Sequence, residues 1–229
     1  MHNKSGKDFC VMAADKNQEA NVVEIPPYNL FMMCQAPIPS AFAPLPKGFS
    51  LRYCRKTELS LWMRMQVEDE LHLPYMQTYF DAVYAPLGDL FFQKCLFVCN
   101  AQDVPVGTCF VWRAYGQINT IHWYKVLPTY EGQGIGRALL SAVLKPLGAA
   151  DYPVYLHTHP SCFRAIHLYA EFGFALLQNT NTGSRNNDLQ KSLPHLERCM
   201  PAEYFARLRF ATAPVEFERI IGGHDHEEF

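Results

Sequence analysis

The chain has 229 residues, 18% of them charged, and a formal net charge of −2 at pH 7. This length suits one domain, or one domain with an appendage, and the 49% of apolar residues can form a substantial core. The balanced charge excludes a basic field for nucleic acid and a polybasic membrane surface. We expect neither a membrane span nor a cleaved signal peptide, because no apolar stretch approaches the roughly 20 residues needed to cross a bilayer.

Residues 1–47 form a leader with six prolines between Pro26 and Pro46. Proline fixes φ and removes a backbone donor, so an extended, irregular path is predicted here. Residues such as Phe31 and Met32 make the stretch too apolar for a free linker. We therefore expect an arm that packs on the body or on a partner chain, which leaves a homodimer open.

The body is predicted to span residues 48–221. Alternating and apolar segments predict, in order, a strand at 49–54, helices at 57–65 and 74–84, and strands at 90–98, 106–112 and 118–126. The last three strands form an antiparallel meander joined by short turns.

After Pro128 the pattern becomes helical. It predicts a helix at 135–144, a strand at 152–158, a helix at 162–172, a strand at 174–177, a polar mobile loop at 179–188, a helix at 201–209 and a final strand at 215–221. Residues 222–229 are expected to form a polar, frayed tail.

Eight cysteines are scattered along the chain, and none forms a CxxC pair. We interpret them as buried, reduced thiols in a cytoplasmic protein. His157 and His159 share a face of a predicted strand, and His122 could join them. No cysteine or carboxylate clearly completes a site, so no metal is expected.

The most informative segment, Glu131-Gly132-Gln133-Gly134-Ile135-Gly136, lies between a strand and a helix. Glycine lets backbone N–H groups approach a ligand closely, and a helix N-terminus adds unsatisfied N–H groups and a positive dipole end. Together these features favour the binding of phosphate oxygens. The spacing lacks the Lys-Ser/Thr of a P-loop and is not GxGxxG.

This segment resembles the pyrophosphate loop of the GNAT superfamily of N-acetyltransferases, Arg/Gln-x-x-Gly-x-Gly/Ala after a strand ending Val-x-Pro. Glu131 departs from the Arg or Gln of that pattern, so the backbone is expected to hold the phosphates. A second block, residues 165–174, is similar to the family's Ala-Ile-x-Leu-Tyr-x-x-x-Gly-Phe helix and strand. The resemblance covers about residues 48–178.

The resemblance implies an α/β fold with a mixed, mostly antiparallel twisted sheet flanked by helices. It also implies acetyl-CoA as co-substrate, bound where the strands at 118–126 and 152–158 splay apart. Backbone groups of two strand residues and of the loop would hold it. These cofactor-binding residues are Tyr124, Val126, Glu131, Gly132, Gln133, Gly134, Ile135, Gly136 and Arg137.

Two side chains are candidates for catalysis. Tyr169 matches the family tyrosine that protonates the leaving thiolate. His122 is the candidate base, because imidazole titrates near neutrality and its spacing of four from Val126 predicts the same strand face. A water relay, or an acidic residue such as Glu68, Asp69 or Glu70, stays open as the base.

The reaction implied is direct transfer of an acetyl group to a primary amine in a ternary complex. A small-molecule acceptor is favoured, and the aromatic set Trp62, Tyr75, Tyr79 and Phe80 suggests an apolar or aromatic amine. Two alternatives stay open: a catalytically silent acyl-CoA-binding module and an acetyltransferase acting on proteins or peptides.

Overall fold

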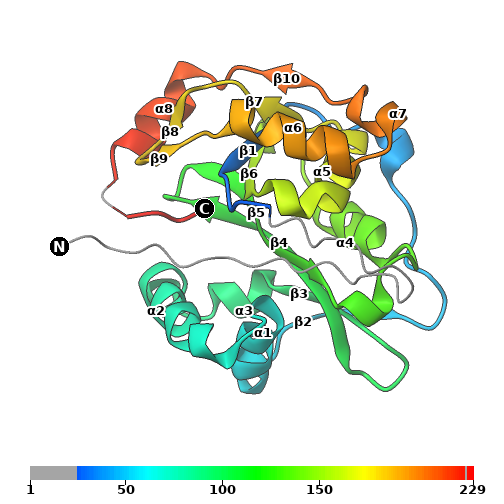
Figure 1. Cartoon of the computed structure of the whole chain (residues 1–229). Helices are drawn as coiled ribbons and strands as arrows, with labels where there is room; N and C mark the ends of the chain where they lie inside the picture. The colour runs from blue at the N-terminus through cyan, green and yellow to red at the C-terminus, as the bar shows by residue number, and fades with distance from the viewer. Residues whose placement is uncertain (1–24, 225) are drawn as a thin grey trace. The chain divides into compact units, whose positions relative to one another are not determined.

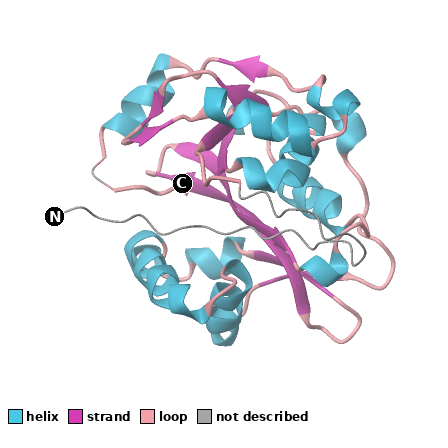
Figure 2. Cartoon of the chain, in the orientation of Figure 1, coloured by secondary structure: helices cyan, strands magenta, loops and turns pink. Residues whose placement is uncertain are grey.

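A computed structural model describes residues 25–224 and 226–229. These residues form two compact units: the first combines the described part of the segment up to Pro37 with Pro153–Glu227, and the second combines Ile38–Tyr152 with Glu228–Phe229. Both units contain helices and strands (Figure 2). The strand pairs are mostly antiparallel, so the predicted mixed α/β class is confirmed.

The second unit carries the predicted meander (Figure 1). Its strands follow the order β5-β4-β3-β2. They are β2 (Ser50–Tyr53), β3 (Leu96–Cys99), β4 (Pro105–Ala114) and β5 (Ile118–Val126). The helices of this unit are α1 (Leu59–Gln66), α2 (Leu73–Val83), α3 (Leu90–Lys94) and α4 (Ile135–Leu144).

Helices α1 to α3 and helix α4 pack on opposite faces of this meander. On one face, Tyr84 after α2 lies 4.8 Å from the ring of Trp112 in β4. On the other face, a Cβ placed on Gly107 of β4 would meet Leu139 of α4 at 3.1 Å. Because side chains alternate along a strand, residues 107 and 112 point to opposite faces. The apolar core of this unit is therefore built on both sides of β4.

The predicted strand at 90–98 is wrong in its first half, which forms α3. A short apolar run does not distinguish a buried strand from a buried helical turn by periodicity alone. Phe91 decides the outcome: it is fully buried, and its ring packs 4.8 Å from Trp62 and 5.1 Å from Phe80.

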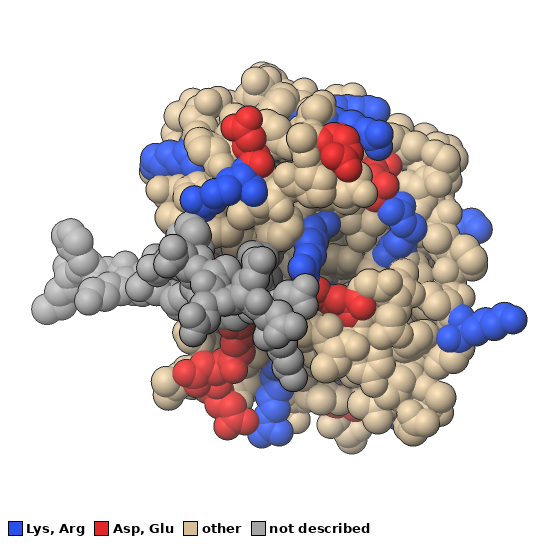
Figure 3. Space-filling view, turned by 45° about the vertical axis from the view of Figure 1, so that its right-hand side comes forward, with Lys and Arg blue, Asp and Glu red and all other residues tan. Residues whose placement is uncertain are grey.

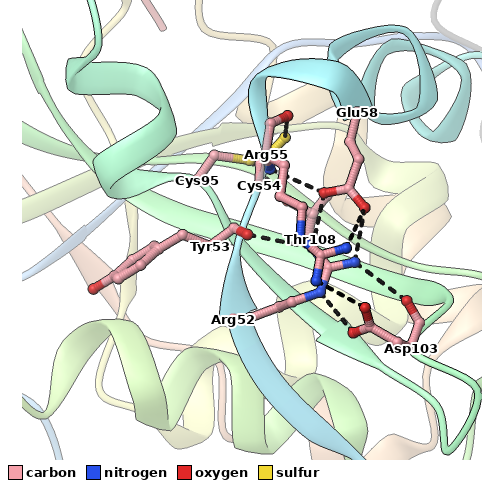
Figure 4. A network of polar contacts seen from close by, with 8 residues as sticks. All are labelled: Arg52, Tyr53, Cys54, Arg55, Glu58, Cys95, Asp103 and Thr108. Carbon is pink, nitrogen blue, oxygen red and sulfur yellow. Dashed lines mark hydrogen bonds and ion pairs between the residues drawn. The ribbon is translucent and has the colours of Figure 1, made fainter.

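A polar network joins the edge strand β2 to the turn between β3 and β4 (Figure 4). The Arg52 guanidinium donates to both carboxylate oxygens of Glu58 at 2.8 Å and to Asp103 at 2.7 Å. Arg55 also donates to Asp103, at 2.9 Å. These bonds hold the edge strand against its neighbours, and the hydrogen bond from Arg52 lowers the pKa of Glu58.

The first unit orders its main strands β10-β7-β1-β6. They are β1 (Leu30–Cys34), β6 (Val154–Thr158), β7 (Ala175–Leu177) and β10 (Phe210–Ala211), with β8 (Asn181–Thr182) and β9 (Arg185–Asn186) as a separate hairpin. The helices are α5 (Phe163–Glu171), α6 (Leu189–Cys199), α7 (Ala202–Phe205) and α8 (Val215–Gly222).

Strand β1 lies inside the proline-rich leader, so the prediction of an irregular path is wrong for Leu30–Cys34. It pairs antiparallel with both β6 and β7. All five of its side chains are buried. A strand buried on both faces reads as a continuous apolar run without alternation, which is why the pattern did not reveal it.

Two further predictions in the first unit are wrong. The segment after Pro214 is helix α8 and not a strand, since Phe217, Ile220 and Ile221 recur at helical spacing and are buried. The polar stretch 179–188 contains the β8–β9 hairpin. The side chain of Asn187 donates to the backbone carbonyl oxygens of Leu177 and Asn179, so hydrogen bonds hold this polar stretch to the end of β7.

The distribution of charge and the character of the helices agree with the expectations drawn from the composition. Acidic and basic side chains are interspersed on the face drawn in Figure 3. Within residues 25–224 and 226–229, no helix has both the length and the apolar character to cross a membrane.

Replacing Glu58 with Gln is expected to lower the free energy of unfolding at pH 7 by about 1 kcal/mol, because a partly screened bidentate ion pair is lost. Because folding lowers the pKa of Glu58, its ion pair stabilises the fold at pH values above the pKa of an ordinary glutamate. This contribution is lost as the pH falls from that value through the pKa of Glu58 in the folded chain. Urea unfolding of the variant should therefore show a weaker loss of stability between about pH 5 and pH 3. The exposed Glu216→Gln variant is the control, and equal losses in the two variants would contradict the account.

Candidate active site

Strand β5 contains a bulge in the middle of the meander. Thr108 pairs with Lys125, and Phe110 pairs with His122, so two residues of β5 oppose one residue of β4. These two residues are Trp123 and Tyr124. Trp123 has a φ of +50°, a left-handed conformation that is strained for a bulky side chain. Such a bulge leaves a residue outside the ladder and redirects the side chains on either side of it.

The bulge places His122 and Val126 on opposite faces, so the predicted shared face is wrong. Val126 pairs with Gly107, on the α4 face, whereas His122 pairs with Phe110, on the face of α1 to α3. The spacing of four residues implies one face only in a regular strand. The extra residue in β5 turns Val126 to the face opposite His122.

A chain of buried hydrogen bonds starts at the bulge. The indole N–H of Trp123 donates to the Tyr84 hydroxyl oxygen at 2.8 Å, and this hydroxyl lies 2.6 Å from Nδ1 of His122. The Tyr84 oxygen accepts from Trp123, and the direction of its bond with His122 depends on the imidazole tautomer. Nδ1 is the acceptor in the tautomer that carries its proton on Nε2.

Burial determines the charge of His122. The side chain is 3% exposed, and loss of hydration lowers its pKa to about 3. Burial likewise raises the pKa of Tyr84 well above its ordinary value. The pair is therefore neutral at pH 7, and protonation of His122 by any route carries a large energetic cost in this buried position.

The acidic alternatives lie near the start of α2 and are exposed. Asp69 accepts a hydrogen bond from the backbone N–H of Leu71 at 2.9 Å. Glu70 lies 3.6 Å from Arg64. Glu68 is also exposed. Their exposure keeps these carboxylates hydrated, unlike His122.

The glycine turn lies directly after β5 and opens α4. Gly132 and Gly134 have φ values of +75° and +80°, and Gly134 is the N-cap of α4 without a side-chain cap. Residues 131–134 are exposed, and no heavy atom lies within 4 Å of a Cβ built on Gly132. The first N–H groups of α4 therefore face an open turn at the positive end of the helix dipole. This combination suits an anionic ligand.

Residues 41–46 lie against the start of α4. The Arg137 guanidinium donates to the carbonyl oxygen of Ala41 at 3.3 Å, and Ser141 accepts from the backbone N–H of Ala43 at 2.9 Å. A Cβ on Gly134 would lie 3.6 Å from Pro46. The predicted contribution of Arg137 to cofactor binding concerns its backbone, and its side chain anchors this segment.

The remaining predicted cofactor residues surround the turn. Tyr124 and Val126 are half-buried, and burial raises the pKa of Tyr124. Ile135 is buried and Gly136 half-buried, while Glu131 and Gln133 are exposed. All of these residues belong to the second unit, in β5, in the loop that follows it or in the first turn of α4.

Tyr169 belongs to the first unit. It lies in α5, is 5% exposed, and its ring packs 5.8 Å from Phe174. Gly173, which follows the helix, has a φ of +99°, as expected for a residue that ends a helix.

Sequence reasoning missed the hydrogen bonds that join Trp123, Tyr84 and His122. The signal for Trp123 is weak but visible: two adjacent aromatic residues interrupt the alternation of β5. Nothing local marks Tyr84, because its partners come from another element. Among the described residues, no group of three or more His, Cys, Asp or Glu is arranged to hold a metal ion.

Comparison with known families identifies this part of the chain. Residues 61–174 match the model of the Acetyltransferase (GNAT) family. This range contains both the bulge of β5 and the glycine turn. Through this domain the chain belongs to the GNAT acetyltransferases. No curated protein matches it.

Solved structures of similar fold include three examples. A Drosophila protein is 18% identical, with 67% of this chain and 49% of that chain covered and a TM-score of 0.47. A GCN5-related N-acetyltransferase from Sphaerobacter thermophilus is 22% identical, with 65% and 48% covered and a TM-score of 0.43. An acetyltransferase from Colwellia psychrerythraea is 12% identical, with 67% and 54% covered and a TM-score of 0.47. The chain spans about half the length of each.

The neutral His122 generates a prediction about acid stability. The unfolded chain takes up a proton on this imidazole below about pH 6.5, whereas the folded chain does so only near pH 3. Stability should therefore fall as the pH decreases from about 6.5 toward 3, with a slope from this group that approaches about 1.4 kcal/mol per pH unit. Urea unfolding at several pH values should show a shallower slope for His122→Gln. Equal slopes would contradict a buried neutral imidazole.

Proposed function

We propose that the chain is an N-acetyltransferase that moves the acetyl group of acetyl-CoA to a primary amine of a small molecule. The observation that carries the proposal is the sequence of features from the β5 bulge to the open glycine turn at α4. Both lie within the segment that matches the acetyltransferase family. The strand end supplies backbone groups for the acyl arm, and the turn supplies N–H groups for the pyrophosphate.

The turn fits phosphate oxygens in its chemistry. Its exposed backbone presents donors without a side-chain cap, and Gly132 leaves space for close approach. Glu131 is exposed, and its carboxylate would repel a phosphate. We therefore infer that backbone N–H groups, and not this side chain, bind the pyrophosphate. Acetyl-CoA, when bound, supplies the thioester whose carbonyl carbon accepts the amine.

The reaction requires two proton transfers. The amine nitrogen attacks the carbonyl carbon, a C–N bond forms and the C–S bond breaks. The amine loses a proton, and the thiolate gains one. We assign the acid role to Tyr169, in line with its family motif. We propose His122, acting through the Tyr84 hydroxyl, as the base, and this role requires that the bound substrates stabilise the buried imidazolium.

The relay assignment rests on the hydrogen bond between Tyr84 and His122 and not on exposure. Tyr84 is fully buried and His122 is 3% exposed, so neither group is open to an amine in this structure. Tyr84 is the hydrogen-bonded neighbour of both His122 and Trp123. A water relay or one of the exposed carboxylates near α2 is the competing base.

The acceptor proposed is an apolar or aromatic amine. Trp62 and Tyr79 pack against Trp123 with ring centroids 5.7 Å and 5.4 Å apart, which supports an aromatic environment at the bulge. The silent acyl-CoA-binding module and the protein or peptide acetyltransferase are the alternative functions. The free cysteines of the described residues support a reducing, cytoplasmic setting. The homodimer considered for the leader stays a prediction.

Thiol release from acetyl-CoA, measured against a panel of amines and peptides, tests the proposal. Amine-dependent release is expected, and Tyr169→Phe should lower kcat at least tenfold while the Kd for acetyl-CoA changes little. Binding of acetyl-CoA without release for any acceptor would support the silent module instead. An unchanged kcat for Tyr169→Phe would remove this residue from the mechanism.

The glycine turn can be tested with a matched pair of variants. Gly132→Ala and Gly116→Ala both place a Cβ at a positive φ in open space, so each should destabilise the fold by about 1 kcal/mol. Only Gly132→Ala should weaken acetyl-CoA binding, by about tenfold, because only this residue lies in the proposed phosphate cradle. Calorimetric titration compares the two. Equal affinities would contradict a cradle at this turn.

A further inference from the structure

The penultimate residue of the chain, Glu228, is held by three hydrogen bonds within the second unit. The Tyr79 hydroxyl donates to its carbonyl oxygen at 2.8 Å. Its backbone N–H donates to the Tyr115 hydroxyl oxygen at 3.1 Å, and its carboxylate accepts from the backbone N–H of Tyr115 at 2.6 Å. Figure 1 marks this end of the chain beside the β4–β5 hairpin.

This pattern is a recognition pattern for an extended peptide. Both backbone polar groups of one residue are bonded, and its acidic side chain is bonded as well. Backbone bonds provide affinity for any peptide, whereas the bond to the carboxylate selects an acidic residue. Two tyrosines from different elements, α2 and the β4–β5 turn, provide all three partners.

The backbone at Tyr115 provides a second, independent observation. Tyr115 and Gly116 have φ values of +54° and +67° in the three-residue loop between the paired residues Ala114 and Ile118. Gly, Asn and Asp adopt a positive φ most readily, and a bulky residue in this conformation costs free energy. The strained tyrosine presents both its hydroxyl and its N–H to Glu228.

The same tyrosines connect to the candidate active site. The Tyr79 ring lies 5.4 Å from Trp123 at the bulge and 5.6 Å from Tyr84, the partner of His122. A peptide bonded to the Tyr79 hydroxyl therefore lies next to the aromatic environment proposed for the acceptor.

We propose that Tyr79 and Tyr115 form a binding site for an extended peptide segment with an acidic side chain, and that Glu228 and Phe229 of this chain are its resident occupant. The occupied site restricts access to the bulge from the Tyr79 side. The restriction of access rests on the proposed function, whereas the existence of the peptide-binding site does not.

A binding measurement tests the site without turnover. The full-length Glu228→Pro variant loses both the N–H and the carboxylate that hold residue 228. A fluorescent peptide with the sequence of residues 222–229 should bind this variant at least tenfold more tightly than the unchanged chain, as measured by anisotropy. The same peptide with Gln in place of Glu228 should bind at least fivefold more weakly.

Further variants locate the binding. Adding Tyr79→Phe or Tyr115→Phe to Glu228→Pro should weaken peptide binding at least fivefold, because each removes one hydroxyl partner. Tyr53→Phe, which changes an exposed tyrosine of β2, is the control and should have no effect. Equal binding by the unchanged chain and Glu228→Pro, or binding that ignores Tyr79 and Tyr115, would overturn the proposal.

The consequence for the active site has its own readout. Glu228→Pro should lower the KM for the amine acceptor severalfold and leave the Kd for acetyl-CoA unchanged, and free peptide should reverse the gain. An unchanged or higher KM would contradict competition with the acceptor. If no amine supports turnover at all, the proposed function fails, and the anisotropy result still decides whether the peptide site exists.

Discussion

The extra residue in β5 is the constraint on which the candidate site depends. Trp123 adopts a left-handed backbone, and its indole N–H is bonded to Tyr84. This anchoring holds a strained conformation that would otherwise relax to a regular strand. As a consequence, His122 points into the aromatic face of α1 to α3, while Val126 points to α4. One backbone irregularity thereby separates His122, the proposed base, from Val126, which is proposed to help hold the cofactor.

Enclosure of the imidazole shapes the chemistry. His122 lies among Tyr84, Phe110 and Trp112, and burial keeps it neutral at pH 7. Because protonation of this buried imidazole is costly, His122 can act as the base only when the bound substrates stabilise its charged form. The Tyr84 hydroxyl, itself fully buried, is the hydrogen-bonded neighbour through which a proton would reach His122. The glycine turn works on a different principle, with backbone donors and no charged side chain.

The sequence predicted some parts of this arrangement well and others not at all. Strand β5 and helix α4 have the predicted ends, residues 118–126 and 135–144, because strong periodicity and a glycine-rich junction define them. The bulge was not predicted, since its local sign is only the pair of adjacent aromatic residues Trp123 and Tyr124. Strand β1 was missed because burial on both faces removes alternation. Tyr84 and Glu228 lie far in sequence from their partners, and local patterns carry no information about such contacts.

Amide hydrogen exchange with and without acetyl-CoA tests the central claim most directly. The account predicts that added protection concentrates at the end of β5, residues 123–126, and at the turn and first turn of α4, residues 132–137. Backbone groups there would be engaged by the acyl arm and the pyrophosphate. Protection confined to other segments, with these two unchanged, would contradict the claim that the bulge and the glycine turn together bind the cofactor.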